Sequence, residues 1–360
     1  MILGCSRPIL RKAVFGLVRR ICETDDGRLI LSDTLRTLPV RWSPLSVDVA
    51  AVPPPPYQDL VLSAADRTHR DPPIFITGRF RSGSTLLWNL FRHVDGCTAY
   101  YEPLNERRWF DPAIRGSHTD ETHRNVSDYW REYAGLERLR RYYREHWTTH
   151  ALYMDATAWN PDMHRFVQAL IDHTSGRPVL QFNRVDFRLG WLRAQFPEAA
   201  VIHVYRHPRD QWVSTLMGDS FPLDGTIRDF AAQDRFYLLS WARDLMHRFP
   251  FLDERTVEHP YELFYFLWKL SYLFGRAYAH VSVVFEDLVR DPATQIREML
   301  DAVKITTFNS AVLSGLVVVP AIGHWKNHGP AEWFLQHEER CERILGDFMR
   351  SVPEAREASR

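Results

Sequence analysis

A glycine-bearing segment near position 80 has the residue types that hold a phosphate. It reads GRFRSGST over residues 78–85 and lies between a β-branched run and an apolar helical pattern. Such a turn directs several backbone N–H groups at one point, and the dipole of the following helix adds partial positive charge there. Gly83 permits close approach of the backbone, and Ser84 and Thr85 add hydroxyl donors. The segment therefore predicts an anion-binding loop; a serine-rich turn that only caps a helix is the alternative.

The charge in this segment distinguishes it from an ordinary nucleotide loop. The spacing of Gly78 and Gly83 matches the start of a Walker A loop, but Ser84 stands where that motif requires lysine. The cation is instead Arg81, whose planar guanidinium can bridge two oxygens of a transferred group. An ATPase or kinase is therefore disfavoured, and the pattern favours an anionic donor that is handled without magnesium.

A second junction of strand and helix offers another anion site. It reads VIHVYRHPRDQWVS over residues 201–214, where Arg206 ends the strand and Ser214 lies one to two turns into the helix. An arginine and a hydroxyl in these positions can hold one phosphate from two sides. Pairing of Arg206 or Arg209 with Asp210 at the helix N-terminus is the alternative.

Together the two segments resemble the sulfotransferase family that uses 3′-phosphoadenosine-5′-phosphosulfate (PAPS). The resemblance implies that the 3′-phosphate is held by Arg206 and Ser214, which are eight positions apart. It implies that the 5′-phosphosulfate is held by Arg81, Ser82, Gly83, Ser84 and Thr85.

This resemblance covers roughly residues 72–334. Residues 284–292 resemble a strand and turn of the family, and Gly323–Asn327 resembles its C-terminal loop, although the Arg-Lys-Gly triplet of cytosolic members is missing; an unrelated surface loop is the alternative. Arginine at position 81 is more usual in the carbohydrate, tyrosyl-protein and bacterial branches. The acceptor hydroxyl is left open among sugars, lipids, other small molecules and tyrosyl side chains.

A hydroxyl that attacks sulfur must lose its proton, so a general base is expected. Glu102 follows the predicted strand that ends at Tyr101, where parallel-sheet enzymes gather active-site groups. It also resembles the glutamate that carbohydrate and tyrosyl-protein sulfotransferases carry after their phosphosulfate loop. Pairing of Glu102 with Arg107 or Arg108 is the alternative. Weaker candidates for the base are His93, His150 and His207.

Arg184 follows another predicted strand and is the third candidate catalytic residue. Its cation can stabilise charge on the sulfuryl oxygens or on the leaving phosphate. It is similar to a lysine that several branches of the family place near this point. A salt bridge to Asp186 or a neighbouring carboxylate is the alternative.

The elements that must position these residues alternate along the chain. From Pro72 onward, short β-branched runs alternate with helical patterns, which is typical of parallel strands joined by crossover helices. We therefore expect an α/β domain with a three-layer, P-loop-like fold, a mainly parallel central sheet and helical insertions. The expected strands are Ile74–Thr77, Thr98–Tyr101, Val179–Phe182, Val201–Tyr205 and Val281–Phe285. The expected helices include Ser127–Trp147, Ile227–Phe249 and Ala293–Val303, the last capped by Asp291.

The composition narrows the class of protein. The 45 basic and 45 acidic residues balance, so no global field favours nucleic acid, and any anion site must be local. The four cysteines are far apart and form no CxxC pair, which predicts neither a zinc site nor a disulfide framework, and we expect a cytoplasmic protein. No metal is expected to take part.

The N-terminal part differs from the rest of the chain. Prolines at positions 53–56 predict a stiff linker, so we expect an N-terminal extension over residues 1–70, a sulfotransferase domain over 71–350 and a tail over 351–360. The first twenty residues are interrupted by Pro8 and basic residues, which disfavours a signal peptide. They predict a surface helix, or alternatively a basic amphipathic helix that contacts a membrane. Oligomeric state is left open.

Two other function classes fit parts of the pattern. The first is a P-loop kinase-like nucleotide enzyme, against which the missing lysine counts. The second is a catalytically inactive nucleotide-binding protein of the same fold. The joint presence of the anion-site residues and the candidate base argues against loss of activity.

Overall fold

The computed structural model describes residues 71–120, 123, 125–320 and 322–351. All of them lie in one compact unit, Arg67–Arg360. The predicted extension over residues 1–70 lies outside the described residues, as does the predicted tail except for Ser351, which ends the last helix.

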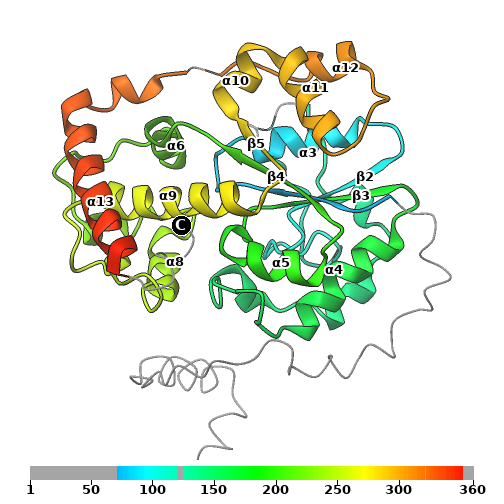
Figure 1. The fold of residues 1–360 in the computed structure, drawn as a ribbon, viewed down its shortest axis with the longest axis horizontal. Helices are drawn as coiled ribbons and strands as arrows, with labels where there is room; N and C mark the ends of the chain where they lie inside the picture. Colours follow the sequence, from blue (N-terminus) through cyan, green and yellow to red (C-terminus); the bar gives the residue numbers. More distant parts are fainter. Residues whose placement is uncertain (1–70, 121–122, 124, 321, 352–360) are drawn as a thin grey trace, which may run out of the picture. The chain divides into compact units, whose positions relative to one another are not determined.

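The described residues form one sheet of five parallel strands in the order β2-β3-β1-β4-β5 (Figure 1). The expectation of a mainly parallel α/β fold is therefore confirmed, and each predicted strand is present within two residues of its bounds. The strands are β1 Ile74–Thr77, β2 Cys97–Tyr101, β3 Arg177–Phe182, β4 Ala200–Tyr205 and β5 Val281–Val284.

Helices cover both faces of this sheet, which gives the three expected layers. In Figure 1, α3 and α10–α12 lie above the sheet, and α4 and α5 lie below it. The α-helices are α3 Ser84–Arg92, α4 Pro161–His173, α5 Leu189–Gln195, α6 Pro208–Thr215, α7 Ile227–Phe230, α8 Leu238–Leu245, α9 Pro260–Tyr278, α10 Phe285–Arg290, α11 Pro292–Ala302, α12 Ser310–Gly315 and α13 Ala331–Ser351. Shorter 3₁₀ turns are η4 Arg131–Tyr133, η5 Glu137–Arg141, η6 Glu145–Thr148, η7 Asp186–Arg188, η8 Pro250–Leu252 and η9 His324–Asn327.

The central strand β1 has all four residues buried, as expected for a strand covered on both faces. Gly78 follows it directly and lies against β4, because a Cβ atom at this position would stand 2.6 Å from the Val204 carbonyl oxygen. The chain can therefore turn from β1 toward α3 close to the backbone of β4 only with glycine at position 78. This approach brings the loop of residues 78–83 next to the segment that follows β4.

Two of the predicted helices are wrong. Residues 127–147 form 3₁₀ turns η4–η6 instead of a continuous helix, with Gly135 between η4 and η5 at φ 79°. Residues 227–249 divide into α7 and α8, because Tyr237 has φ 61° and the Asp234 carboxylate accepts hydrogen bonds from the first amides of α8. In contrast, α11 begins as predicted, with the Asp291 side chain accepting from the Thr294 N–H.

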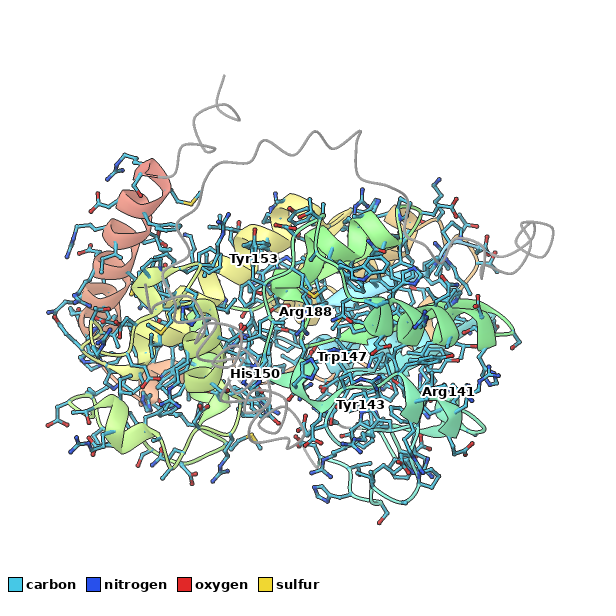
Figure 2. All side chains as sticks on the ribbon, turned by 90° about the horizontal axis from the view of Figure 1, so that it is seen from below. Arg141, Tyr143, Trp147, His150, Tyr153 and Arg188 are labelled. Carbon is cyan, nitrogen blue, oxygen red and sulfur yellow. The ribbon has the colours of Figure 1, made fainter. Side chains whose placement is uncertain are left out.

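The buried side chain of Arg188 anchors the 3₁₀ segment. Figure 2 shows it beside Trp147 and His150, whose carbonyl oxygens each accept a hydrogen bond from Arg188 Nη2 at 2.9 Å. Nη1 donates to the Arg184 carbonyl at 2.8 Å. Burial lowers the pKa of Arg188 to about 10, with partial compensation by Asp244. Arg188 thus connects the insertion that precedes α4 to the backbone of a candidate catalytic residue.

None of the described helices is both long enough and apolar enough to cross a membrane.

Candidate active site

The predicted site residues gather at one edge of the sheet. The loop of residues 78–83 follows β1, Glu102 follows β2, Arg184 follows β3 and Arg206 follows β4. Since these strands are parallel and neighbouring, their carboxyl ends meet at one edge, where open α/β sheets bind ligands. The sequence predicted each of these four positions, and the sheet order explains why they converge.

The loop after β1 has an anion-binding geometry. Gly83 caps α3 with φ 98° and, being glycine, has no side chain to accept a hydrogen bond from the first amides of this helix. Arg81 has φ 66°, which is uncommon for a residue other than glycine and is a form of backbone strain that concentrates at functional sites. The buried Ser82 hydroxyl has no hydrogen-bond partner among the described residues. These features leave the N-terminus of α3 suited to a phosphate.

Ser84 and Thr85 connect the loop to the neighbouring strands. Ser84 Oγ donates to Asn183 Oδ1 at 2.8 Å, and Thr85 Oγ1 lies 3.2 Å from the hydroxyl of Tyr101. Both partners lie at the carboxyl ends of their strands. The loop is therefore held against β2 and β3 by the hydroxyls that were predicted to bind the donor.

The two predicted anion sites adjoin each other. Arg81 Nε donates a hydrogen bond to Ser214 Oγ at 3.0 Å, which links the loop to α6. The ring of Phe285 forms a second link, because a Cβ atom on Gly83 would meet this ring at 2.3 Å. The guanidinium of Arg206 lies over the same ring, 5.0 Å from its centroid. Arg206 and the loop therefore both lie against the ring of Phe285.

The electrostatics at Arg206 favour an anion. Burial lowers the pKa of Arg206, while Asp210 and Glu286 oppose this effect and the nearby Arg81 adds to it. Its Nε is buried and has no hydrogen-bond partner among the described residues. A doubly charged phosphate beside Arg81 and Arg206 would relieve both the burial of the cations and their repulsion.

Among the described residues, neither Arg206 nor Arg209 forms a salt bridge with Asp210, although the charge of Asp210 still raises the pKa of Arg206. The Asp210 carboxylate instead accepts from the amides of Gly323 and Trp325 at 2.8 and 3.1 Å. Arg209 pairs with Glu338 at 2.7 Å and lies over the Trp325 ring. The loop Gly323–Asn327 is thus held on the start of α6, whereas Lys326 within it is exposed.

Glu102 is buried and its carboxylate is hydrogen-bonded on both oxygens. Asn183 Nδ2 donates to Oε1 at 2.5 Å. Asn105 Nδ2 and Arg184 Nη1 donate to Oε2 at 2.6 and 2.7 Å. The alternative partners Arg107 and Arg108 are therefore wrong, and the arginine that pairs with Glu102 is the other candidate catalytic residue. With φ 37°, Glu102 is also in a strained backbone conformation.

Arg184 is held between two carboxylates. Arg184 pairs with Glu102 and also with Glu106, whose Oε2 lies 2.6 Å from Arg184 Nη2. Burial opposes its charge, but Glu102 and Glu106 outweigh burial and raise the pKa of Arg184 above its usual value. The alternative of a salt bridge to a neighbouring carboxylate is therefore present, although not to Asp186, which instead accepts from Thr77 and Ser271 at 2.7 and 2.9 Å. A guanidinium that stays charged at this point can stabilise developing negative charge.

Four contributors to this site were not predicted from the sequence. Asn183 lies between Ser84 and Glu102, and Phe285 lies between Gly83 and Arg206. Glu106 pairs with Arg184 and accepts a hydrogen bond from the Tyr237 hydroxyl at 2.6 Å. Asn183 stands immediately before Arg184, so its place after a predicted strand was a usable signal. Tyr237 belongs to a predicted helix, and no local signal marked its left-handed conformation.

The insertion after β2 also reaches the loop of residues 78–83. Asp120 Oδ2 lies 3.6 Å from Arg81 Nη1. His123 Nδ1 lies 2.6 Å from the Tyr129 hydroxyl, and burial lowers the pKa of His123, an effect that Arg81 reinforces and Asp120 and Glu102 oppose. A carboxylate therefore shares the cation that was predicted to bind the donor.

The three histidines that were weaker candidates for the base make contacts with other groups. His93 Nδ1 lies 2.8 Å from the Asn89 carbonyl, and His150 Nδ1 lies 2.9 Å from Thr149 Oγ1. The ring of His207 stacks on Trp325. None of these contacts places a histidine against Glu102 or the loop.

One group of described residues, Glu258, Glu262 and His337, has ligand atoms close enough together to hold a metal. Arg340 pairs with both carboxylates, and His337 Nδ1 lies 2.7 Å from Glu262. The guanidinium therefore already balances the charge that a metal would balance.

One family model matches more than half of this chain. The model of the sulfotransferase family matches residues 72–309. Among curated proteins, no sequence matches this chain.

Three similar solved structures are bacterial sulfotransferases. The sulfotransferase domain of the Synechococcus PCC 7002 olefin synthase is 17% identical, with 79% of this chain and 98% of that chain covered and a TM-score of 0.35. STF9 from Mycobacterium avium is 12% identical, with 80% and 78% covered and a TM-score of 0.40. STF1 from Mycobacterium tuberculosis H37Rv is 14% identical, with 76% and 78% covered and a TM-score of 0.40.

Proposed function

The chain belongs to the sulfotransferase family, and from this premise we propose that it transfers a sulfuryl group from PAPS to an acceptor hydroxyl. The observation that carries the proposal is that the two predicted anion sites adjoin each other. Arg81 bonds to Ser214, and Gly83 and Arg206 both border the ring of Phe285. A nucleotide with phosphates at both ends of its ribose needs two such sites within reach of each other.

The donor's 5′-phosphosulfate is assigned to the loop. The amides at the start of α3 and the side chains of Arg81, Ser82, Ser84 and Thr85 supply its donors. The 3′-phosphate is assigned to Arg206 and Ser214. The Ser82 hydroxyl and Arg206 Nε have no hydrogen-bond partner in the described part of the chain, which supports this assignment because buried donors normally have partners.

The reaction then needs a base and charge stabilisation. The acceptor oxygen attacks sulfur in line, its bond to sulfur forms as the bond from sulfur to the 5′-phosphate oxygen breaks, and Glu102 takes the acceptor's proton. Adenosine 3′,5′-bisphosphate leaves. Arg81, Arg184 and the loop amides stabilise the charge that develops on the departing phosphate and the sulfuryl oxygens. Because these cations belong to the chain, the proposed mechanism uses no metal.

The acceptor is proposed to be a small molecule or carbohydrate. The cavity beside Phe80, lined by Arg79, Trp212, Phe230 and Phe264 among others, has a volume of about 20 Å³. This volume suits a water molecule and not an acceptor, so the cavity is not assigned to the acceptor. A lipid hydroxyl or tyrosyl side chain is the alternative acceptor, and a cytoplasmic location is part of the proposal.

A thermal-shift comparison tests the donor site. Adenosine 3′,5′-bisphosphate without metal should raise the melting temperature, because it binds only the folded state, whereas Mg-ATP should have little effect. The reverse result would favour a kinase-like enzyme. An acceptor screen by mass spectrometry, with PAPS supplied, should detect a gain of one sulfuryl group. Binding of the bisphosphate without transfer to any acceptor in a broad panel would indicate the inactive nucleotide-binding protein.

A further inference from the structure

Asn183 connects the phosphosulfate loop to the candidate base. It directly follows β3, which lies between β1 and β2 in the sheet, and it is 5% exposed. Its Oδ1 accepts from Ser84 Oγ at 2.8 Å and from Gln181 Nε2 at 2.6 Å. Its Nδ2 donates to Glu102 Oε1 at 2.5 Å. One amide therefore contacts an element of the donor site and the proposed proton acceptor.

The orientation of this amide follows from its partners. Gln181 Nε2 is a donor, so the Asn183 atom that faces it must be an oxygen. An ionised carboxylate only accepts hydrogen bonds, so the atom that faces Glu102 must be the NH₂ group. A flipped amide would place two acceptors against each other at Glu102 and two donors against each other at Gln181. The environment thus selects a single orientation.

Building on the proposed function, we infer that Asn183 is a positioning residue for sulfuryl transfer. It holds the carboxylate of Glu102 in a fixed orientation beside the loop that carries Ser84. A hydrogen bond to the charged form of an acid stabilises that form. Asn105 and Arg184 both bind Oε2, whereas Asn183 binds Oε1 and so fixes the rotation of the carboxylate.

Other charged and titratable groups also face Glu102. The cation is Arg184, with Glu106 on its far side. Also in electrostatic contact with Glu102 are Tyr101, His123, Tyr129 and Tyr133. The three tyrosines all have their pKa raised by burial and are neutral near pH 7, and His123 has its pKa lowered. Glu102 therefore has one fixed cation, Arg184, and mostly neutral groups around it. The effect of a new charge at position 183 on the rate profile is interpreted in this environment.

The isosteric substitution Asn183→Asp tests the inference. It keeps an oxygen for Ser84 and Gln181 but replaces the donor to Glu102 by a second carboxylate. Two adjacent carboxylates bind one proton between them, so the acid limb of the rate profile should move to higher pH. We expect kcat at saturating PAPS to show this limb shifted by about one pH unit or more. Asn183→Ala, which removes the donor without adding charge, should shift it in the same direction by less.

The measurement is release of radiolabelled sulfate from PAPS with water as acceptor, or transfer to an acceptor found by the screen, from pH 5 to 9. Asn309→Asp is the matched control, since it adds the same charge at the exposed N-cap of α12 and keeps the cap; its profile should coincide with that of the unmodified protein. An active Asn183→Asp variant with an unshifted acid limb would overturn the inference, as would loss of rate at every pH without a shift in either variant. Failure of the unmodified protein to bind adenosine 3′,5′-bisphosphate would instead contradict the proposed function.

Discussion

The Nε atom of Arg81 donates a hydrogen bond to Oγ of Ser214 at 3.0 Å, across 133 positions of the sequence. Each residue belongs to a different strand-helix segment, so this contact joins the loop after β1 to the last turn of α6. The contact brings together the two segments that were predicted to bind anions, as the proposed binding of one doubly phosphorylated nucleotide requires.

Loss of the Arg206 cation should weaken binding of adenosine 3′,5′-bisphosphate. Arg206→Met keeps an apolar stem against Phe285 and removes the charge, and we expect the Kd to rise about 10- to 100-fold, the range for a charge-assisted hydrogen bond. Titration calorimetry measures this change. Arg297→Met, an exposed position on α11, alters the net charge equally and should leave the Kd unchanged. Equal effects of the two substitutions would show that net charge, and not Arg206, matters.

The loop conformation should depend on Gly83 for two reasons. Gly83→Ala adds a Cβ atom 2.3 Å from the Phe285 ring and also carries the penalty of about 1–2 kcal/mol for positive φ. Gly96→Ala is the matched control, since Gly96 has φ 78° but open space around its Cβ position. Thermal unfolding should show a larger loss of stability for Gly83→Ala, and only this variant should lose bisphosphate binding. Equal losses for both variants would contradict a role for the contact with Phe285.

Removal of the candidate base should affect turnover more than donor binding. Glu102→Gln is expected to lower kcat by about 10²- to 10⁴-fold, the usual contribution of a general base, with little change in the Kd for the bisphosphate. Glu106→Gln is the comparison, because Glu106 forms an ion pair of similar length with Arg184. Its loss of turnover should be smaller. If the two losses match, the effect comes from the Arg184 ion pairs, and the base must be reassigned.

The carboxylate of Asp120 should compete with the donor for Arg81. Asp120→Asn weakens the attraction across 3.6 Å, so bisphosphate binding should tighten by up to about fivefold, the range for a partly exposed ion pair. Calorimetry at low salt should reveal the difference, and added salt should reduce it. Asp253→Asn, which removes the charge from the pair with Arg255, should have no effect. Weaker binding by Asp120→Asn would show that Asp120 supports the loop.

The free energy of unfolding should fall in mild acid because of His203. Burial, reinforced by Arg276, lowers the pKa of His203 to about 4, against 6.5 in the unfolded chain. Between these values the unfolded chain gains a proton that the folded protein does not, so stability decreases as the pH falls from 6.5 to 4, by up to about 3 kcal/mol. Urea unfolding of His203→Gln should show a weaker pH dependence. The exposed His247→Gln should retain the full dependence, and an unchanged slope in His203→Gln would contradict the assignment.

The sequence by itself determined the features that depend on neighbours in the chain. The run of apolar residues in Ile74–Thr77 fits a strand buried on both faces, and Gly83 followed by serine and threonine fits a turn into a helix. Asp291 before Pro292 predicted the start of α11, since capping involves only the first turn. Parallel strands then bring their carboxyl ends to one edge. This local information was sufficient for the fold class and for the positions of Arg81, Glu102, Arg184 and Arg206.

Only the tertiary structure decided which of these side chains meet. Glu102 pairs with Arg184 and not with the nearby Arg107 or Arg108, because β2 and β3 are neighbours in the sheet. The predicted helix over 127–147 is absent partly because its residues bond to distant groups, such as the Tyr133 hydroxyl to the Tyr101 carbonyl at 2.9 Å. The positions of Asn183 and Phe285 beside the other site residues follow from the order of the strands in the sheet. Periodicity and capping describe contacts within a few residues, whereas these contacts arise only when the sheet assembles.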